Sequence, residues 1–284
     1  MTLGVLYSRV RVEEKQIFAC LERRHIAFVR LDEALLHLAL GGRGPQADIV
    51  LDRSIQHGRS LYTLTLLNAA GITTVNSAEV VQTCGDKVLT SAKLSTAGLP
   101  MPKTSVAFTQ KAALDAIEEM GYPVVLKPLV GSWGRLLAKI NDRDAAEAVL
   151  EHKQTLGSYQ HGIFFIQEYV AKPQRDIRTL VVDNEVIGAI YRASDHWITN
   201  TARTGRALAC TVTPEIERLS LEAARAVGGG ALAVDLLEHA DGLLLNEVNS
   251  TMEFHGFAEA TGIDVADRLV NYLVRLAQRS RAVA

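Results

Sequence analysis

The chain has 284 residues, of which 48% are hydrophobic and 22% charged, and its formal net charge is −2. This length suffices for a sizeable core spread over two or three lobes, and the small net charge gives no reason to expect a general nucleic-acid or membrane binder. Cys20, Cys84 and Cys210 are widely spaced without a C-x-x-C pair, which argues against a disulfide framework and a zinc site. Because the sequence shows neither a signal-peptide core nor an apolar run of membrane-spanning length, we expect a cytoplasmic protein.

The first third of the chain alternates apolar segments of strand and helix length. Alternation of this kind builds a small parallel sheet. No G-x-G-x-x-G follows the first strand, where the sequence is YSRVR, so a dinucleotide site is not expected. The expected strands are LGVLYS, AFVRL, DIVLD and ITTVN, and the expected helices cover 12–24 and 61–70.

A longer helical segment follows from a cap at Ser77. Gly85 interrupts this segment, and Gly98 with the prolines that follow it ends the helix. We expect the first domain boundary at this proline-containing exit. Lys87 lies just after the interruption, and as a lone lysine it is also explained by a solvated surface charge.

The segment YPVVLKPLVGSWGRLLAKI predicts a strand, VVLK, and a partner strand, LLAKI, joined by a loop over 131–134. Lys127 ends the first strand, and a lysine buried in an apolar strand requires an anion. Backbone N–H groups of a glycine-bearing loop suit phosphate oxygens. A plain hairpin with a surface lysine is the alternative, and the loop lacks the P-loop order G-x-x-x-x-G-K-[ST].

The segment 231–249 consists of two apolar runs that flank His-Ala-Asp-Gly, which predicts a β-hairpin. If the turn centres near Asp241, residues whose numbers sum to about 482 face each other, which places Asp235 opposite Glu247 with Cβ atoms ~5 Å apart. Glu247 and Asn249 share one face of their strand. Oxygen ligands without His or Cys favour Mg²⁺. The alternative is that Asp235 faces solvent and Glu247 pairs with a lysine or arginine.

Two further polar patterns stand out. Asp176 and Arg178 alternate with apolar neighbours on one predicted strand, so both point the same way, either as a structural ion pair or as part of a site. The segment 192–206 is polar and aperiodic, and we expect its arginines, Arg192, Arg203 and Arg206, on one loop. Three guanidinium groups suit recognition of carboxylate or phosphate, whereas a solvated loop is the alternative.

The order of these segments resembles the ATP-grasp superfamily over essentially the whole chain. Within it the chain resembles the RimK-related LysX/ArgX branch, whose enzymes join α-aminoadipate or glutamate to the amino-group carrier protein LysW in lysine or arginine biosynthesis. Several independent strings in the same order carry the resemblance, whereas any one alone would not. These strings are CGDKVLTSAKLSTAGLPMPKT, YPVVLKPLVGSWGRLLAKI, IQEYVAKPQRDIR, HWITNTAR and LLLNEVNSTMEF.

The resemblance implies an α/β fold with α+β lobes. It implies a Rossmann-like pre-ATP-grasp domain with its connecting helix over 1–98, a central lid domain over 99–170, and a C-terminal ATP-grasp domain with the metal and acceptor sites over 171–284. The implied cofactors are ATP and two Mg²⁺ ions. The implied partners are a small acidic LysW-like carrier protein and a small amino acid, with no nucleic acid or membrane, and the implied assembly is a homo-oligomer, either a dimer or a tetramer.

The resemblance also implies roles for individual residues. Lys87 and Lys127 would hold the α- and β-phosphates, and Asp235, Glu247 and Asn249 would bind Mg²⁺. The loop that covers the nucleotide would consist of Gly131, Ser132, Trp133, Gly134, Arg135, Leu136 and Leu137. The strand that reads adenine would provide Gln167, Glu168, Tyr169 and Val170.

The remaining implied roles concern the reacting groups. Asp176 and Arg178 would lie beside the ribose and the acceptor end. Contacts with the γ-phosphate and the reacting carboxylate would come from Asn200 and from two catalytic arginines, Arg192 and Arg203. The implied substrate-binding residues are Thr201, Ala202, Gly256 and Phe257.

In this branch ATP converts the side-chain carboxylate of the carrier's C-terminal glutamate into an acyl phosphate, which an α-amino group then attacks. Both steps gather negative charge on a few oxygens, which fixed lysine, arginine and magnesium charges stabilise. Loop closure keeps water from the intermediate. The residues after M-E-F are Asn-Ser in the aminoadipate enzymes and Gly-Phe in the glutamate enzymes, and here they are Gly256-Phe257 after His255.

The nature of the amino-acid substrate stays open at this point. A phenylalanine at position 257 would shorten the pocket by about one methylene, which is worth only ~1–3 kcal/mol of discrimination. The motif favours glutamate, whereas the overall similarity favours aminoadipate. Three other functions compete: a RimK-type ligase that adds glutamate to another protein or peptide terminus, a non-catalytic nucleotide-binding protein, and a small-molecule kinase.

Overall fold

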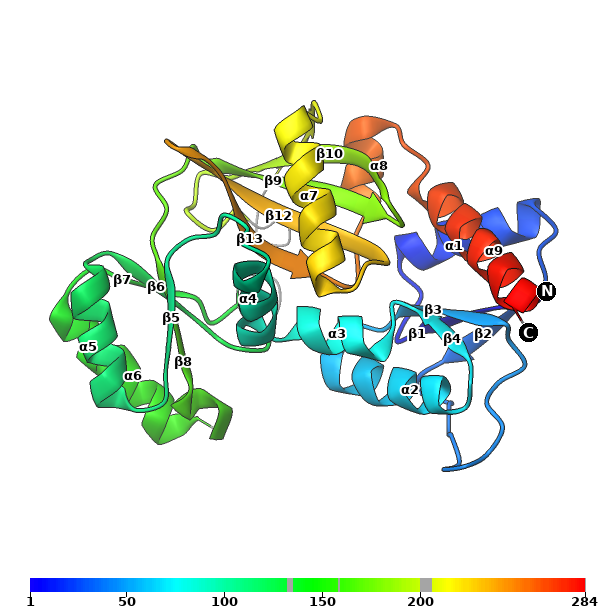
Figure 1. The fold of residues 1–284 in the computed structure, drawn as a ribbon, viewed down its shortest axis with the longest axis horizontal. Helices are drawn as coiled ribbons and strands as arrows, with labels where there is room; N and C mark the ends of the chain where they lie inside the picture. Colours follow the sequence, from blue (N-terminus) through cyan, green and yellow to red (C-terminus); the bar gives the residue numbers. More distant parts are fainter. Residues whose placement is uncertain (132–134, 158, 200–205, 284) are drawn as a thin grey trace.

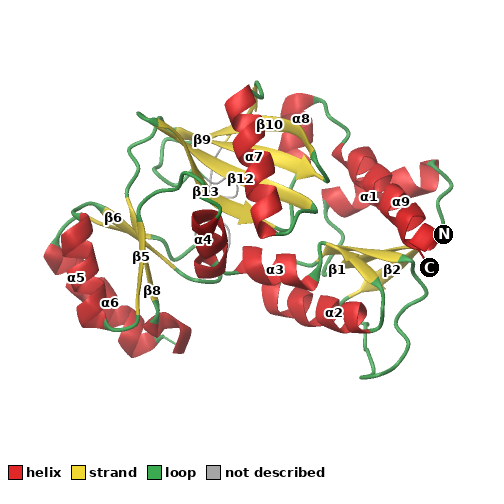
Figure 2. Ribbon diagram, in the orientation of Figure 1, coloured by secondary structure: helices red, strands yellow, loops and turns green. Residues whose placement is uncertain are grey.

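The computed structural model describes residues 1–131, 135–157, 159–199 and 206–283. It contains three sheets, each accompanied by helices, which confirms the expected α/β class (Figures 1 and 2). A small sheet with two helices lies at one end of the long axis, the largest sheet lies in the middle, and the N-terminal sheet lies at the other end (Figure 1). In the described ranges, no helix has the length and apolar character needed to cross a membrane.

The N-terminal sheet is parallel, with the strand order β2-β1-β3-β4, as the alternating pattern predicted. Its strands are fully or half buried and are flanked by amphipathic helices, the arrangement expected of a parallel sheet. The elements are β1 (Leu3–Tyr7), α1 (Val12–Arg23), β2 (Phe28–Asp32), β3 (Ile49–Arg53), α2 (His57–Ala69) and β4 (Thr73–Val75).

Two short helices, α3 (Ala78–Gly85) and α4 (Lys87–Thr96), form the segment that leads out of this sheet, and the predicted interruption at Gly85 is confirmed. The Ser77 hydroxyl accepts a hydrogen bond from Val80 N–H and caps α3. The Asp86 carboxylate accepts from the second and third residues of α4 and caps that helix. Lys87 is therefore the first residue of α4.

The sheet in the segment that was expected to form the lid is antiparallel, in the order β5-β8-β6-β7, and we use the name lid sheet for it. Figure 1 shows its two helices, α5 and α6, on one side of it. Its apolar side chains form a core of their own with these helices. Strand β5 was not predicted. The elements are β5 (Thr104–Ala107), α5 (Gln110–Met120), β6 (Val124–Lys127), β7 (Ala138–Ile140), α6 (Arg143–Leu156), the short 3₁₀ helix η1 (Tyr159–Gly162) and β8 (Phe164–Glu168).

The largest sheet is antiparallel, in the order β11-β10-β9-β12-β13. The predicted hairpin is its β12-β13 edge, and the apolar stripe of α7 packs on one face. The prediction that Arg192 and Arg206 lie on one loop is wrong, because Arg192 is part of strand β10 and Arg206 is the first residue of β11. Strand β11 and helix α8 were not predicted from the sequence. The elements are β9 (Arg175–Val182), β10 (Glu185–Ala193), β11 (Arg206–Cys210), α7 (Pro214–Val227), β12 (Ala231–His239), β13 (Gly242–Asn249), α8 (His255–Thr261) and α9 (Val265–Val283).

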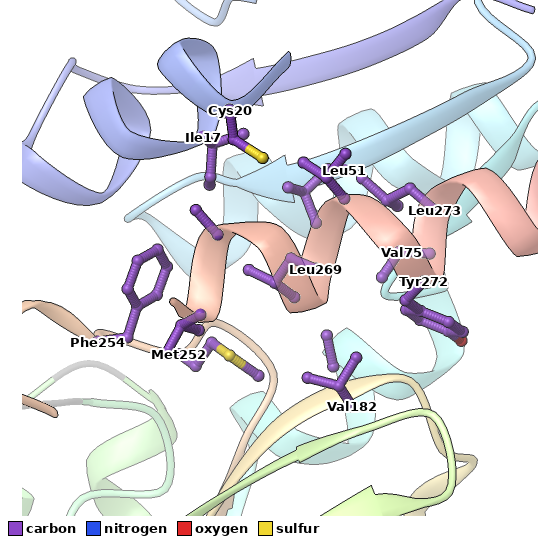
Figure 3. Packing of buried hydrophobic residues seen from close by; sticks show 14 of the residues in the cluster. Ile17, Cys20, Leu51, Val75, Val182, Met252, Phe254, Leu269, Tyr272 and Leu273 are labelled. Carbon is purple, nitrogen blue, oxygen red and sulfur yellow. The ribbon is translucent and has the colours of Figure 1, made fainter. Parts of the chain in front are cut away.

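Helix α9 joins the N-terminal sheet to the largest sheet through one apolar core. Leu269 and Leu273 of α9 lie among Ile17 of α1, Leu51 of β3 and Val182 of β9 (Figure 3). Fully burying a side chain of this size contributes about 1.5–3 kcal/mol relative to leaving it exposed. The two sheets are therefore held together by shared packing, which fixes the positions of the polar residues at their junction.

Candidate active site

The hairpin has the predicted register at its open end. Asp235 lies opposite Glu247, and Ala233 lies opposite Asn249. Between Asp235 and Leu236 the register shifts, because Leu236 pairs with Leu245 and leaves Asn246 as an extra residue on β13. A bulge of this kind bends a strand and re-aims its side chains.

Asn246 was missed by the sequence analysis, because the extra residue shows only in the register of the folded hairpin. The pairs beside the two-residue turn sum to 481, whereas Asp235 and Glu247 sum to 482, so one strand must carry an extra residue. The Asn246 amide oxygen accepts a hydrogen bond of 2.9 Å from the Lys127 ammonium group. The bulge thereby brings the hairpin into contact with the lid sheet.

A row of charges of alternating sign crosses the largest sheet. Arg178 of β9 lies opposite Asp235, with its Nε 2.7 Å from Oδ1 and its Nη2 2.8 Å from Oδ2. Arg192 of β10 lies opposite Asp176, with its Nε 2.6 Å from Asp176 Oδ1 and its Nη2 3.1 Å from Asp235 Oδ2. Asp176 and Arg178 share a face as predicted, but each pairs with a neighbouring strand. We name these four residues the charged row.

Burial and pairing act in opposite directions on the charged row. Asp235 is 2% exposed and Arg192 is 3% exposed. Burial alone would raise the pKa of Asp235, but Arg178 and Arg192 hold this pKa below its usual value. Burial disfavours the charge on Arg192, yet Asp235 and Asp176 raise the pKa of this guanidinium. Asp235 and Arg192 therefore face each other as a buried ion pair, and the charged row as a whole comprises two carboxylates and two guanidinium groups.

Both predicted phosphate-binding lysines meet the hairpin. The Lys87 ammonium group lies 3.2 Å from Glu247 Oε1 and donates a 3.1 Å hydrogen bond to the Gly131 carbonyl. Lys127 is only 9% exposed. Burial lowers the pKa of Lys127 to about 8, although the negative charges of Glu247 and Asp235 oppose this shift. The site thus concentrates positive charge beside the two carboxylates.

A first cavity lies between the lid sheet and the charged row. Its lining combines apolar side chains with lysines and carboxylates, which matches a ligand with a flat apolar ring at one end and anionic groups at the other. The predicted residues that line it are Lys127, Leu137, Gln167, Glu168, Tyr169, Val170, Asp176, Arg192, Asp235 and Glu247. The lining residues that the sequence analysis did not assign are Val125, Lys172, Trp197, Ile198, Thr199, Leu237 and Asn246.

Lys172 is the unassigned residue most firmly tied to the charged row. Its ammonium group donates a 2.7 Å hydrogen bond to the Thr199 hydroxyl and lies 3.7 Å from Asp176 Oδ2. The Thr199 hydroxyl in turn donates to Asp176. Burial lowers the pKa of Lys172, while Asp176 opposes that change. In the sequence, Lys172 lies four residues before Asp176 in the string AKPQRDIR, and this spacing is the signal that could have predicted its place in the site.

A second cavity lies between the N-terminal sheet and the hairpin, and it shares Lys127, Leu137, Asn246 and Glu247 with the first. The two cavities therefore meet at the hairpin carboxylate and the buried lysine. The second cavity is lined further by residues from the N-terminal sheet and its helices, namely Arg11, Ser54, Ile55, Gln56, His57, Ser60, Val81, Cys84, Gly85 and Lys87. Its other lining residues are Pro128, Val130, Gly131, Arg135, Leu136, Arg178, Asn249, Ser250, Thr251 and Glu253.

The wall of the second cavity requires a glycine at position 85. A Cβ atom there would lie 2.0 Å from Cε1 and 2.1 Å from Nδ1 of the His57 ring, closer than any real contact. Burial lowers the pKa of His57, although Asp86 opposes this shift, so the imidazole is mainly neutral at pH 7. Gly85 thus lets a neutral imidazole approach the backbone closely two residues before Lys87.

Asp235, Glu247 and Asn249 have the chemistry of a magnesium site. Among the described residues, the amide nitrogen of Asn249 is buried without a hydrogen-bond partner, so the surrounding protein leaves this side chain available for another ligand. The amide group can turn to present its oxygen. Each oxygen of Asp235 accepts from a guanidinium but keeps a further lone pair. Two carboxylates and an amide oxygen fit Mg²⁺.

Some predicted site residues lie elsewhere or outside the described part of the chain. Phe257 is 1% exposed and packs in the core, where a Cβ on Gly188 would lie 3.0 Å from its ring. Neither Gly256 nor Phe257 lines either of these two cavities, because α8 turns the Phe257 ring into the core, and their role in substrate binding stays a prediction. The predicted residues outside the described ranges are Ser132, Trp133, Gly134, Asn200, Thr201, Ala202 and Arg203.

Comparison with known families agrees with this geometry. Residues 84–273 match the family described as the RimK-like ATP-grasp domain, and residues 3–83 match the LysX preATP-grasp domain. The chain belongs to the RimK-like ATP-grasp family. As a RimK-like ATP-grasp protein it is a ligase, and ligases of this kind use ATP and Mg²⁺.

Three known proteins illustrate the similarity of this RimK-like ligase to others. It is 34% identical over 276 residues to the glutamate–LysW ligase ArgX of Sulfolobus acidocaldarius, which covers 96% of this chain and 98% of the relative. It is 35% identical over 230 residues to the α-aminoadipate–LysW ligase LysX of the same organism, which covers 80% of this chain and 83% of the relative. The solved structure of a RimK domain ATP-grasp protein from Sphaerobacter thermophilus is 27% identical, with a TM-score of 0.82, and covers 96% of this chain and 99% of that one.

Proposed function

We propose that this protein activates the C-terminal glutamate of a small acidic LysW-like carrier protein with ATP and joins it to the α-amino group of glutamate or α-aminoadipate. The product would feed arginine or lysine biosynthesis in the cytoplasm. The relatives named ArgX and LysX support the carrier and the two amino acids. The observation that carries the proposal is the contact of Lys87 and Lys127 with the hairpin of Asp235 and Glu247, where the two cavities meet.

Each cavity has one task in this proposal. The nucleotide occupies the first cavity, with adenine beside the 167–170 strand end and the phosphates beside Lys127. The carrier carboxylate and the amino acid enter the second cavity. Since Lys127 and Glu247 line both cavities, the phosphoryl group passes from one to the other without leaving the protein.

Fixed charges supply most of the catalysis in this scheme. The reacting oxygens gain negative charge twice, when the carboxylate is phosphorylated and when the amine attacks the acyl phosphate. Arg178 and Arg192 are held by the charged row before reaction, so they need no reorganisation to stabilise that charge. Two Mg²⁺ ions held by Asp235, Glu247 and Asn249 would add charge neutralisation on the phosphate oxygens when bound.

The choice between glutamate and aminoadipate is assigned to the second cavity. Phe257 packs in the core, so any effect of the Gly-Phe pair on selectivity passes through the position of α8. The side chains that can meet the amino acid directly include Ser54, Gln56 and His57. One methylene is worth only ~1–3 kcal/mol in such a pocket, so we propose that both amino acids are used.

The decisive experiment combines the purified protein, ATP, Mg²⁺, the carrier protein and either amino acid. We expect ADP rather than AMP, and a mass increase of one amino-acid residue on the intact carrier. A carrier without its terminal glutamate is the matched control and should gain no mass. The absence of any mass increase with either amino acid would refute the proposal.

Two further measurements separate the competing functions. Hydroxylamine should trap the acyl phosphate as a hydroxamate on the carrier, whereas a stable phosphorylated product would favour a kinase. Replacing the carrier by another glutamate-ending protein or peptide tests the RimK-type alternative. We also propose three domains, 1–98, 99–170 and 171–284, in a homo-oligomer, and light scattering distinguishes its dimer from its tetramer.

A further inference from the structure

Asn76 is a buried side chain of the N-terminal domain that contacts the hairpin instead of its own sheet. It is 3% exposed. Its amide oxygen accepts a 2.7 Å hydrogen bond from Ala231 N–H, and its amide nitrogen donates a 2.8 Å hydrogen bond to the Ala231 carbonyl. The same nitrogen donates to the Ser250 carbonyl. Both donors and the acceptor of this amide group are therefore used.

These bonds tie together the two strand ends that carry the proposed metal ligands. Ala231 is the first residue of β12, and Ser250 directly follows Asn249, the last residue of β13. The strands pair only from Ala233 and Asn249 inward, so the Asn76 amide replaces the backbone hydrogen bonds that β12 and β13 do not make at this end. On its other side this end of β12 pairs with β9, so the Asn76 amide is the side chain that links Ala231 to the end of β13.

The neighbourhood is shaped for this amide group. A Cβ on Gly230 would lie 2.0 Å from the Asn76 amide oxygen, and Gly230 has a φ of +113°, which side chains rarely adopt. Asn76 also directly precedes Ser77, the cap of α3, and α3 leads to Lys87 at the start of α4. One residue thus connects the hairpin to the helix pair that presents Lys87.

We propose that Asn76 is a positioning residue that sets the β12-β13 spacing and thereby holds Asn249 and Glu247 in the geometry that binds the metal. The inference rests on the proposed magnesium site and not on the identity of the carrier or the amino acid. Its chemical reason is that only an amide of this length offers two donors and one acceptor to two strands at once. Aspartate would turn an oxygen toward the carbonyl oxygens of Ala231 and Ser250.

The test measures how strongly Mg²⁺ tightens the binding of ADP, by calorimetry with and without the metal. In the Asn76→Ala variant we expect this tightening to fall about tenfold, equivalent to about 1.4 kcal/mol, while metal-free binding of ADP is unchanged. The Asn76→Ser variant, which keeps a short polar group, should show an intermediate loss and provides a second measurement if the alanine variant does not fold.

Asn68→Ala is the matched control. The Asn68 amide also makes three hydrogen bonds, to the Ile72 carbonyl, to the Thr74 hydroxyl and from Ala78 N–H, and these bonds all stay within the N-terminal domain. We expect this variant to lose thermal stability but to keep the full effect of Mg²⁺ on ADP binding. Equal tightening in the Asn76 variants and the wild type, or an equal loss in the Asn68 variant, would overturn the inference. If Mg²⁺ tightens ADP binding in the wild type but the wild type never modifies the carrier, the proposed function is refuted and the inference about Asn76 is not.

Discussion

The Lys127→Met substitution tests the electrostatics of the site most directly. Lys127 is buried at the end of β6, and its ammonium group has one hydrogen bond in the described structure, to Asn246. Methionine has a similar length and no charge, so the substitution removes the ammonium group with little change in volume. We expect the variant to be more stable than the wild type and unable to bind nucleotide tightly.

The size of the expected change in the free energy of unfolding follows from the lowered pKa of Lys127. A pKa of about 8 in place of the usual 10.5 for Lys127 means that the folded protein disfavours this charge by about 3 kcal/mol at neutral pH. The substitution also leaves the Asn246 oxygen without its donor, which costs ~1–2 kcal/mol. We therefore expect the free energy of unfolding to rise by ~1–2 kcal/mol at pH 7.

The sign of the pH dependence gives a second check. Between pH 8 and about 10.5, the unfolded chain binds more protons at Lys127 than the folded protein does, so the stability of the wild type rises with pH through this group. Below pH 8 Lys127 is protonated in both the folded and the unfolded protein, so the full loss of stability caused by its buried charge is present. The difference in stability between the variant and the wild type should thus shrink as the pH rises from 8 to 10.5.

Denaturant unfolding at several pH values measures both effects, with and without Mg·ADP. At one hundred times its Kd, Mg·ADP should stabilise the wild type by about 2.7 kcal/mol, and it should stabilise the variant far less. Lys93→Met, at an exposed position of α4, is the control and should change neither quantity. A Lys127→Met protein that is less stable than the wild type at pH 7 would refute the reasoning.

Other substitutions test the hairpin and the second cavity. Glu247→Gln should reduce the rate of product formation on the carrier by about a hundredfold or more, with a much smaller loss of stability than Asp235→Asn, because this side chain is partly exposed. Asp235→Asn should also abolish turnover but should destabilise the fold by ~3–5 kcal/mol, because it leaves the buried guanidinium of Arg192 and the half-buried guanidinium of Arg178 undercompensated. Equal stability of the two variants would contradict the charged row. Gly85→Ala should displace His57 and raise KM for the amino acid about tenfold with little change in KM for ATP, and steady-state kinetics with each substrate varied in turn separates the two.

The register of the hairpin was predictable from sequence because it depends on local geometry. A turn signal and the two-residue period of a strand suffice to place Asp235 opposite Glu247, and the structure has this pairing. The same reasoning did not find the bulge at Asn246. A bulge leaves the apolar pattern of LLLN nearly unchanged, and the contact with Lys127 that uses it comes from a different sheet.

The location of Arg192 was not predictable in this way. A charged residue after an apolar run is normally a sign that the strand has ended, so 192–206 was interpreted as a loop. Arg192 is buried because Asp176 and Asp235 on neighbouring strands compensate its charge, and that pairing is not visible along the sequence. The burial of the Phe257 ring was not visible along the sequence either, because the direction of this ring is set by the short helix α8.

The charged row limits which amino-acid substitutions this site can accept during evolution. Asp176, Arg178, Arg192 and Asp235 alternate in sign, so replacing any one of them leaves an odd charge inside the protein. In a random library with one mutation per clone, substitutions at any of these four positions should be absent from the clones that keep a folded, active enzyme. A folded enzyme with altered acceptor chemistry therefore requires that two oppositely charged members of the row change together, both in natural evolution and in protein design.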